Sequence, residues 1–202
     1  MIIKPSTIYK NSAFCYGMAT MTRFYTRRGD HGITIMGSKK LSKDDPLFDA
    51  LGGLDELNSW LAVCRSSIGN KSKDISKLIL AIQETLFIAQ AEIAAIGMEQ
   101  PTKINVSKEK TDELESKIAE MDKAMPEITK FIIPGGSQLS SNLDYARAIA
   151  RRAERGVRKF DKAKKLRPEL IQYINRLSSI LFAMARYVNY KSKIKEQNPS
   201  YK

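Results

Sequence analysis

Apolar residues recur at alternating steps of three and four in five separate stretches of the chain. This spacing places apolar side chains along one face of an α-helix, and it is typical of helices that pack nearly antiparallel in a bundle. The stretches cover residues 51–68, 75–96, 114–125, 143–160 and 170–188. The sequence therefore predicts an all-α fold, an up-down bundle of five helices in one domain.

Signals for β-strands are almost absent, since the short apolar run at residues 131–133 is cut off by Pro134 and two glycines. The fifth helical stretch opens at Pro168, a favoured position in the first turn of a helix. Its second face also carries apolar residues, namely Ile171, Ile180 and Phe182. A helix that is apolar nearly all round is buried on more than one side. We expect this helix to be central in the bundle or to lie at a subunit interface.

The counts of histidine and cysteine exclude several classes of enzyme. The 202 residues include one histidine, His31, and two cysteines, Cys15 and Cys64. One histidine excludes most zinc enzymes, and also a di-iron bundle, which needs a Glu-x-x-His motif on each of two helices. We therefore expect a ferritin-like architecture without the di-iron site, and no metal-ligating residues. Two distant cysteines favour a reducing compartment, so we expect a cytoplasmic protein.

The net charge of +12, from 34 basic and 22 acidic residues, leaves the class of partner open. A basic surface can bind the phosphates of nucleic acid or of an anionic membrane, and it can also bind a small polyanion such as a nucleotide. The basic residues are widely spread, so a solvated surface explains most of them. No stretch reaches about 18 uninterrupted apolar residues, which argues against a membrane span.

The ends of the chain are expected to differ from its middle. Residues 1–22 lack the apolar core of a secretion signal, and we expect them to form a poorly ordered extension. Residues 23–190 would form the helical-bundle domain, and residues 191–202 a basic tail.

Residues 26–34, Thr-Arg-Arg-Gly-Asp-His-Gly-Ile-Thr, precede the first helix and have the composition of a loop. Two glycines three residues apart let a backbone turn and approach a ligand closely. Backbone N–H groups, arginines and hydroxyls in such a loop can wrap a polyphosphate. The Gly-Lys-Ser/Thr ending of a P-loop is missing, and an ordinary turn is the alternative interpretation.

The fourth helical stretch carries a row of charges that borders its alanine-rich apolar face. At about 100° per residue, the row falls within about a third of the helix circumference. Its members are Asp144, Arg147, Arg151, Glu154, Arg155 and Arg158. The planar fork of arginine binds phosphate oxygens in pairs and keeps its charge, so the row is a candidate oxyanion site. A solvent-exposed face with ion pairs four residues apart is the alternative.

Two polar residues on other helices complete the set of candidates. Asp55, in the first helical stretch, could pair with an arginine of the fourth, or could simply favour the positive end of its own helix. Asn175 lies on the second face of the fifth stretch, near Phe182, where a semi-buried amide could read a base edge or satisfy a neighbouring backbone group.

Taken together, these segments resemble the ATP:cob(I)alamin adenosyltransferases of the propanediol-utilisation type. The matching pieces appear in the order and spacing of that family over residues 23–190: FYTRRGDHGIT, KDDPLFDALGGLDELNSWLA, FIIPGG, ARAIARRAERGV and YINRLSSILFAMAR. The resemblance implies transfer of the 5′-deoxyadenosyl group of ATP to the cobalt of cob(I)alamin, with triphosphate as the other product. It also implies Mg²⁺ and a homotrimer with an active site at each subunit interface.

The resemblance assigns roles by position. The ATP loop would comprise Thr26, Arg27, Arg28, Gly29, Asp30, Gly32 and Thr34. The residues facing the triphosphate would be Lys43, Arg151, Arg152, Glu154 and Arg155, with Asn175 completing the nucleotide site. Asp55 and Arg147 would form an ion pair between subunits, and Phe131 would displace the lower axial ligand of the corrinoid; core packing is the alternative for Phe131.

Other interpretations stay open at this point. Arg28, His31 and Ser179 depart from the residues usual in the family, and the last two are left out of the expected site. The chain could instead deliver adenosylcobalamin to an acceptor enzyme without making it, or bind nucleic acid. As an adenosyltransferase it would depend on a cob(II)alamin reductase and could supply an acceptor enzyme, and we expect neither nucleic acid nor a membrane among its partners.

Overall fold

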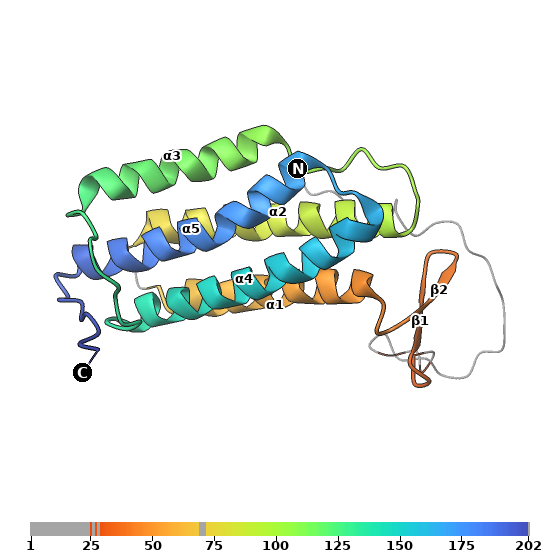
Figure 1. Cartoon of the computed structure of the whole chain (residues 1–202), viewed down its shortest axis with the longest axis horizontal. Coiled ribbons are helices and arrows are strands. Elements are labelled where there is room, and N and C mark those ends of the chain that lie inside the picture. The colour runs from red at the N-terminus through yellow and green to blue at the C-terminus, as the bar shows by residue number, and fades with distance from the viewer. Residues whose placement is uncertain (1–24, 26, 28, 69–71, 202) are drawn as a thin grey trace.

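The computed structural model describes residues 25, 27, 29–68 and 72–201, and over this range the predicted five-helix bundle is confirmed (Figure 1). The helices, in chain order, are α1 (Pro46–Ser66), α2 (Lys73–Gly97), α3 (Lys108–Ala124), α4 (Gln138–Lys164) and α5 (Pro168–Lys191). The expected extension at residues 1–22 and two residues of the expected ATP loop, Thr26 and Arg28, lie outside the described residues.

Local chemistry sets where the helices begin. At α1, the side chain of Asp45 accepts a hydrogen bond from the backbone N–H of Leu47, and Pro46 takes the first turn. At α4, the hydroxyl of Ser137 accepts from the backbone N–H of Ser140. The α5 helix opens at Pro168, as the sequence predicts.

The core lies where α4 packs against α1 and α5, and α5 packs against α3 on its other side. A Cβ added to Gly53 of α1 would lie 3.1 Å from the Cα of Ala153, so glycine lets the α1 and α4 backbones approach closely. Of the second apolar face of α5, Ile171 and Ile180 are buried, whereas Phe182 is partly exposed. Within one chain α5 therefore takes the central position, one of the two alternatives that its second apolar face predicts.

A two-stranded hairpin precedes α1, where the sequence analysis expected only loop. Its strands β1 (Ile33–Met36) and β2 (Lys39–Ser42) pair antiparallel, with Met36 opposite Lys39. Gly37, at φ +59°, begins the two-residue turn between them. This glycine between two short runs was the available signal, but strands of four residues are too short for a clear alternation.

The two ends of the bundle are covered by different segments (Figure 1). The hairpin lies at the end where α1 begins and α4 ends, whereas the 125–137 loop and residues 192–201 lie at the opposite end. The α2 helix is long and apolar enough to cross a membrane by length and composition alone. Core helices pass the same test, and α2 buries Ile79, Ile82 and Leu86 in the bundle.

Candidate active site

The row of arginines on α4 lies beside a cavity between α3, α4 and α5. The opposite face of α4 is buried through Ala146, Ile149, Ala150 and Ala153, and this anchors the helix with its charged side outward. Arg147 is half-buried, and Arg151, Arg152 and Arg155 are exposed. The bulk of α4 thus holds a fixed row of positive charge at the surface of the bundle.

The cavity has a volume of about 360 Å³ and is lined by groups of two kinds. Arg147 and Arg151 supply positive charge from α4, while Phe182 and Ala183 of α5 supply an apolar wall. The Nε of Arg147 is buried and has no hydrogen-bond partner among the described residues. A ligand that is anionic in one part and apolar in another fits such a lining.

Four residues of the expected nucleotide site are joined in two pairs along the middle of α4. The side-chain amide of Asn175 donates to Glu154 at 2.7 Å, and one guanidinium nitrogen of Arg155 donates to the carbonyl of Arg151 at 3.0 Å. Asn175 is exposed rather than semi-buried as expected, so its side-chain amide does not pack in the core. Arg152 is turned aside, since it forms an exposed ion pair with Glu56 of α1.

The N-terminal loop forms a second cluster of expected residues. Gly29 lies so close to Lys43 that a Cβ at this position would be 2.9 Å from the lysine Nζ. Gly32, at φ +75°, accepts a hydrogen bond at its carbonyl from the backbone N–H of Lys43. The loop therefore brings Lys43 against the glycine turn, as a phosphate-binding loop requires.

The remaining loop residues are more exposed. Arg27, at φ +58°, lies with its guanidinium 5.5 Å from the ring centre of Tyr25, and Asp30 is exposed. Thr34 belongs to β1 rather than to a loop, and its side chain is half-buried.

Among the described residues of one chain, no hydrogen bond or ion pair joins the N-terminal loop to the arginine row of α4. Lys39 of the hairpin and Lys164 at the end of α4 both form ion pairs with Glu99. Arg155 precedes Lys164 by about nine residues, which is about 14 Å along the helix. Asp55 is exposed on α1 and forms no ion pair with Arg147 in the described part of the chain.

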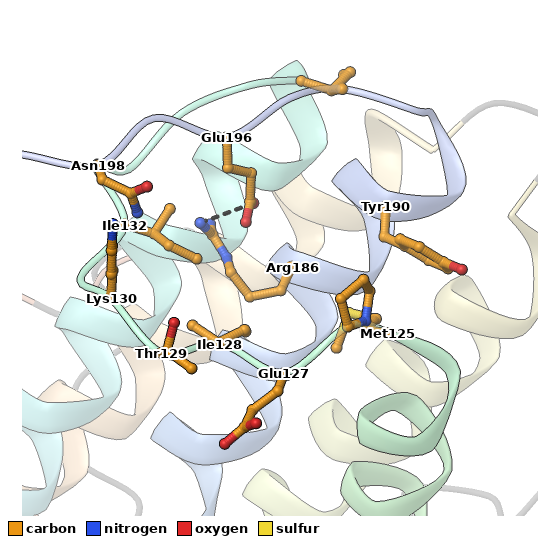
Figure 2. A pocket seen from close by; sticks show the side chains of 12 residues that line it. Met125, Glu127, Ile128, Thr129, Lys130, Ile132, Arg186, Tyr190, Glu196 and Asn198 are labelled. Atoms are coloured by element: carbon orange, nitrogen blue, oxygen red, sulfur yellow. Dashed lines mark ion pairs between the residues drawn. The ribbon is translucent and has the colours of Figure 1, made fainter.

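Phe131 lies in the loop between α3 and α4, and its side chain is 79% exposed. Core packing therefore does not explain this residue. The loop borders a second cavity of about 300 Å³, whose walls include Ile128, Ile132 and Arg186 (Figure 2). Arg186 also lines the cavity beside the arginine row, so it lies between the two cavities.

The sequence analysis missed Arg186, a buried arginine that pairs with Asp144 of α4. Only 2% of the Arg186 side chain and 5% of the Asp144 side chain are exposed. Asp144 had been placed in the charged row, but it points into the bundle. Phe182, Arg186 and Asn189 follow each other at steps of four and three, so they lie on one face of α5. Two polar residues that continue an apolar face are the pattern that could have indicated a buried arginine.

Comparison with known proteins identifies a family. The family model described as "Cobalamin adenosyltransferase" matches residues 24–188. A corrinoid adenosyltransferase of Bacillus subtilis is 34% identical over 174 residues, which is 85% of this chain and 89% of the relative. The corrinoid adenosyltransferase PduO of Salmonella typhimurium is 39% identical over 168 residues, and the match covers 80% of this chain but only 48% of that longer protein.

Solved structures agree. A variant PduO-type ATP:corrinoid adenosyltransferase of Lactobacillus reuteri, described as complexed with cobalamin and ATP, superposes with a TM-score of 0.81 at 36% sequence identity. The superposition covers 88% of this chain and 97% of that one.

Proposed function

The chain belongs to the cobalamin adenosyltransferase family, and from this premise we propose that it transfers the 5′-deoxyadenosyl group of ATP to the cobalt of cob(I)alamin. The observation that carries the proposal is the row of arginines on α4 at a cavity that also has an apolar wall. The two parts of that lining match the two substrates, since the arginines suit a triphosphate and the apolar wall suits a corrin ring.

The proposed reaction balances without a proton. The electron pair of cobalt(I) attacks the 5′ carbon of ATP, a Co–C bond forms, the C–O bond to the triphosphate breaks, and cobalt becomes formally cobalt(III). The leaving group gains negative charge in the transition state. Arg151 and Arg155, fixed on a packed helix, would stabilise that charge without reorganising. No step needs a general base, so a chain with one histidine suffices.

Mg²⁺ would accompany the triphosphate. Among the described residues, no three His, Cys, Asp or Glu side chains converge on one point. A magnesium ion bound here would therefore take most of its ligands from phosphate oxygens and water, which is usual for nucleotide sites. Glu154, held by Asn175 beside the arginines, is the carboxylate available to such an ion or to its water.

Phe131 would act one step earlier, on cobalt(II). A nitrogen ligand below cobalt(II) makes its reduction to cobalt(I) difficult, so removing that ligand raises the reduction potential. The ring of Phe131 is exposed and free to occupy the lower face of a bound corrinoid. There it would also exclude water from the reactive cobalt(I). The single electron would come from a reduced flavin or a flavoprotein reductase.

The site would be completed between subunits of a homotrimer. Over the described residues of a single chain, no contact joins Gly29 or Lys43 to the arginine row, and Asp55 forms no ion pair with Arg147, which a site shared between subunits would explain. In a ring of three chains, the loop of one subunit would close over α4 of the next, and Asp55 would pair with Arg147 across the interface. We place the protein in the cytoplasm, where a reductase and an adenosylcobalamin-dependent acceptor enzyme would be its partners.

The first experiment is an anaerobic assay with ATP, Mg²⁺ and chemically reduced cob(I)alamin, followed by absorbance. We expect a light-sensitive adenosylcobalamin spectrum, and we expect Arg151→Ala to lower kcat by about 10²–10³-fold, the usual cost of removing a donor to a developing anion. Lys159→Ala is the matched control, because Lys159 is exposed on the same helix, lies outside the charged row and pairs with Asp49. Tight binding of adenosylcobalamin without turnover by the native protein would point to a delivery module instead.

Shared sites can be tested by mixing two inactive variants. Lys43→Ala removes the loop lysine and Arg151→Ala removes an α4 arginine, so co-assembled trimers would contain about a quarter of sites with both halves intact. Recovery of activity on co-expression supports a site between subunits. A mixture as inactive as its components, or a monomer in light scattering, contradicts it.

A further inference from the structure

Residues 194–198, which we call the strap, lie alongside the loop that carries Phe131. The backbone N–H of Ile133 donates to the carbonyl of Gln197 at 2.8 Å, and the side-chain amide of Asn198 donates to the carbonyl of Phe131 at 2.8 Å. These two bonds lie on either side of Ile132 and pair the loop with the strap over three residues. Figure 2 shows the strap passing over the cavity beside that loop.

A second anchor holds the same loop further along. Asn189, fully buried in α5, donates to the carbonyl of Gly135 at 2.9 Å and accepts from the backbone N–H of Ser137 at 3.2 Å. The backbone from Phe131 to Ser137 is therefore fixed at both ends, by the strap and by α5.

Glu196 is the residue that ties the strap to the bundle. One of its carboxylate oxygens accepts from Arg186 at 2.9 Å (Figure 2). The same oxygen accepts from the side-chain amide of Asn189 at 2.8 Å. Arg186 is buried and also pairs with Asp144. Buried Arg186 therefore pairs with two carboxylates, Asp144 of α4 and Glu196 of the strap. Glu196 also accepts from Asn189, the residue that anchors the Phe131 loop to α5.

The side chain of Phe131 has little else to fix it, because most of its surface is exposed. Its position follows from its backbone, and its backbone is bonded to the strap. We propose that Glu196 is a positioning residue for Phe131: by pairing with Arg186 and Asn189 it holds the strap, and the strap holds the phenylalanine where the lower ligand of cobalt(II) must be displaced. The inference rests on the proposed function.

The test separates the two stages of the reaction. Transfer from pre-reduced cob(I)alamin needs the arginine row, whereas turnover from cob(II)alamin with reduced flavin also needs the lower ligand removed. Glu196→Gln keeps the acceptor oxygen but removes its charge. We expect it to lower kcat from cob(II)alamin about tenfold, since a hydrogen bond to a charged group contributes more than a neutral one, and to leave the rate from cob(I)alamin within about twofold. A chain that ends at Lys193 lacks the whole strap, so its rate from cob(II)alamin should fall further while its rate from cob(I)alamin stays close to the native value.

Glu127→Gln is the matched control, since Glu127 lines the same cavity and makes no ion pair among the described residues. Paramagnetic resonance of bound cob(II)alamin gives a second readout, because splitting by the axial nitrogen is lost when that ligand leaves. With ATP present, the native protein and the control should lose the splitting, and Glu196→Gln should keep a larger part of it. Hydrogen exchange at the amide of Ile133 should also be faster in Glu196→Gln.

Two results would overturn the inference. One is Glu196→Gln behaving like Glu127→Gln in both assays; the other is an equal loss from cob(I)alamin and cob(II)alamin, which would indicate a general effect on the fold. Failure of the proposed function looks different: the native protein itself would then not adenosylate cob(I)alamin, while exchange at Ile133 would still report whether Glu196 holds the strap.

Discussion

At one end of the bundle the charges that join separate segments are buried, and at the other end they are exposed. Arg186 and Asp144, which link α5 to α4, have side chains exposed by 2% and 5%. Lys39 and Glu99, which link the hairpin to the end of α2, have side chains exposed by 34% and 64%. The first pair joins two helices and the second joins the hairpin to the end of a helix, and breaking them should cost different amounts of folding free energy.

The burial of these ion pairs decides how firmly a single chain holds the segment beside each of them. A buried charge that loses its partner is left without water, so the groups around Arg186 are held firmly. An exposed pair loses little when it opens, because water replaces the partner. The Phe131 loop is therefore set within one chain, whereas the loop of Gly29 and Lys43 stays loosely attached, as suits a segment that a neighbouring subunit and a nucleotide would complete.

The largest expected effect is at the buried end. Asp144→Asn keeps the shape of the side chain but leaves Arg186 with one carboxylate fewer, and we expect the free energy of unfolding to fall by about 3–5 kcal/mol. Urea denaturation of native and variant protein measures it. Glu56→Gln, which breaks the exposed pair with Arg152, is the control and should leave the midpoint unchanged. Equal midpoints for all three proteins would remove the contrast between buried and exposed pairs.

A smaller effect is expected from the backbone of the same end. Gly136 has φ +107°, and an added Cβ would lie 2.5 Å from the side chain of Asn189. We expect Gly136→Ala to cost about 1–3 kcal/mol and to disturb the loop that carries Phe131. Gly52→Ala is the counterpart, since it lies in α1 with nothing within 4 Å of a Cβ and should stabilise by about 0.4–1 kcal/mol. Thermal unfolding of both variants measures the two effects. A lower melting temperature for Gly52→Ala would contradict the prediction that a methyl group is tolerated on this exposed face of α1.

The smallest effect belongs to the exposed end and depends on pH. The hydrogen bond from Lys164, followed by that from Lys39, lowers the pKa of Glu99 from 4.5 to about 2. A lowered pKa stabilises the folded chain above about pH 4.5, and this contribution disappears as the pH falls toward 2. Glu99→Gln should therefore lower the melting temperature slightly at pH 7 and not at pH 2. Glu84→Gln, an exposed change on α2, should have the same small effect at both pH values.

Much of the fold could be predicted from the sequence because five helices with apolar seams repeat a simple period. Lys43 and the arginines of α4 could be named from motifs, and the family resemblance implied a site shared between subunits. The hairpin that carries part of the loop could not be predicted, since its four-residue strands leave no clear pattern. Arg186 was missed because counting apolar residues ignores a buried cation. Its partners Asp144 and Glu196 lie 42 and 10 positions away, and no local pattern joins them.

The strap has a consequence for how the protein is made. Residues 194–198 leave the ribosome after all five helices, at about 5–20 residues per second. A chain whose five helices have packed but whose strap has not docked can bury its core, but it lacks the contact of Glu196 with Arg186. The loop that carries Phe131 would therefore gain its anchor from the strap only after the helices around it have packed.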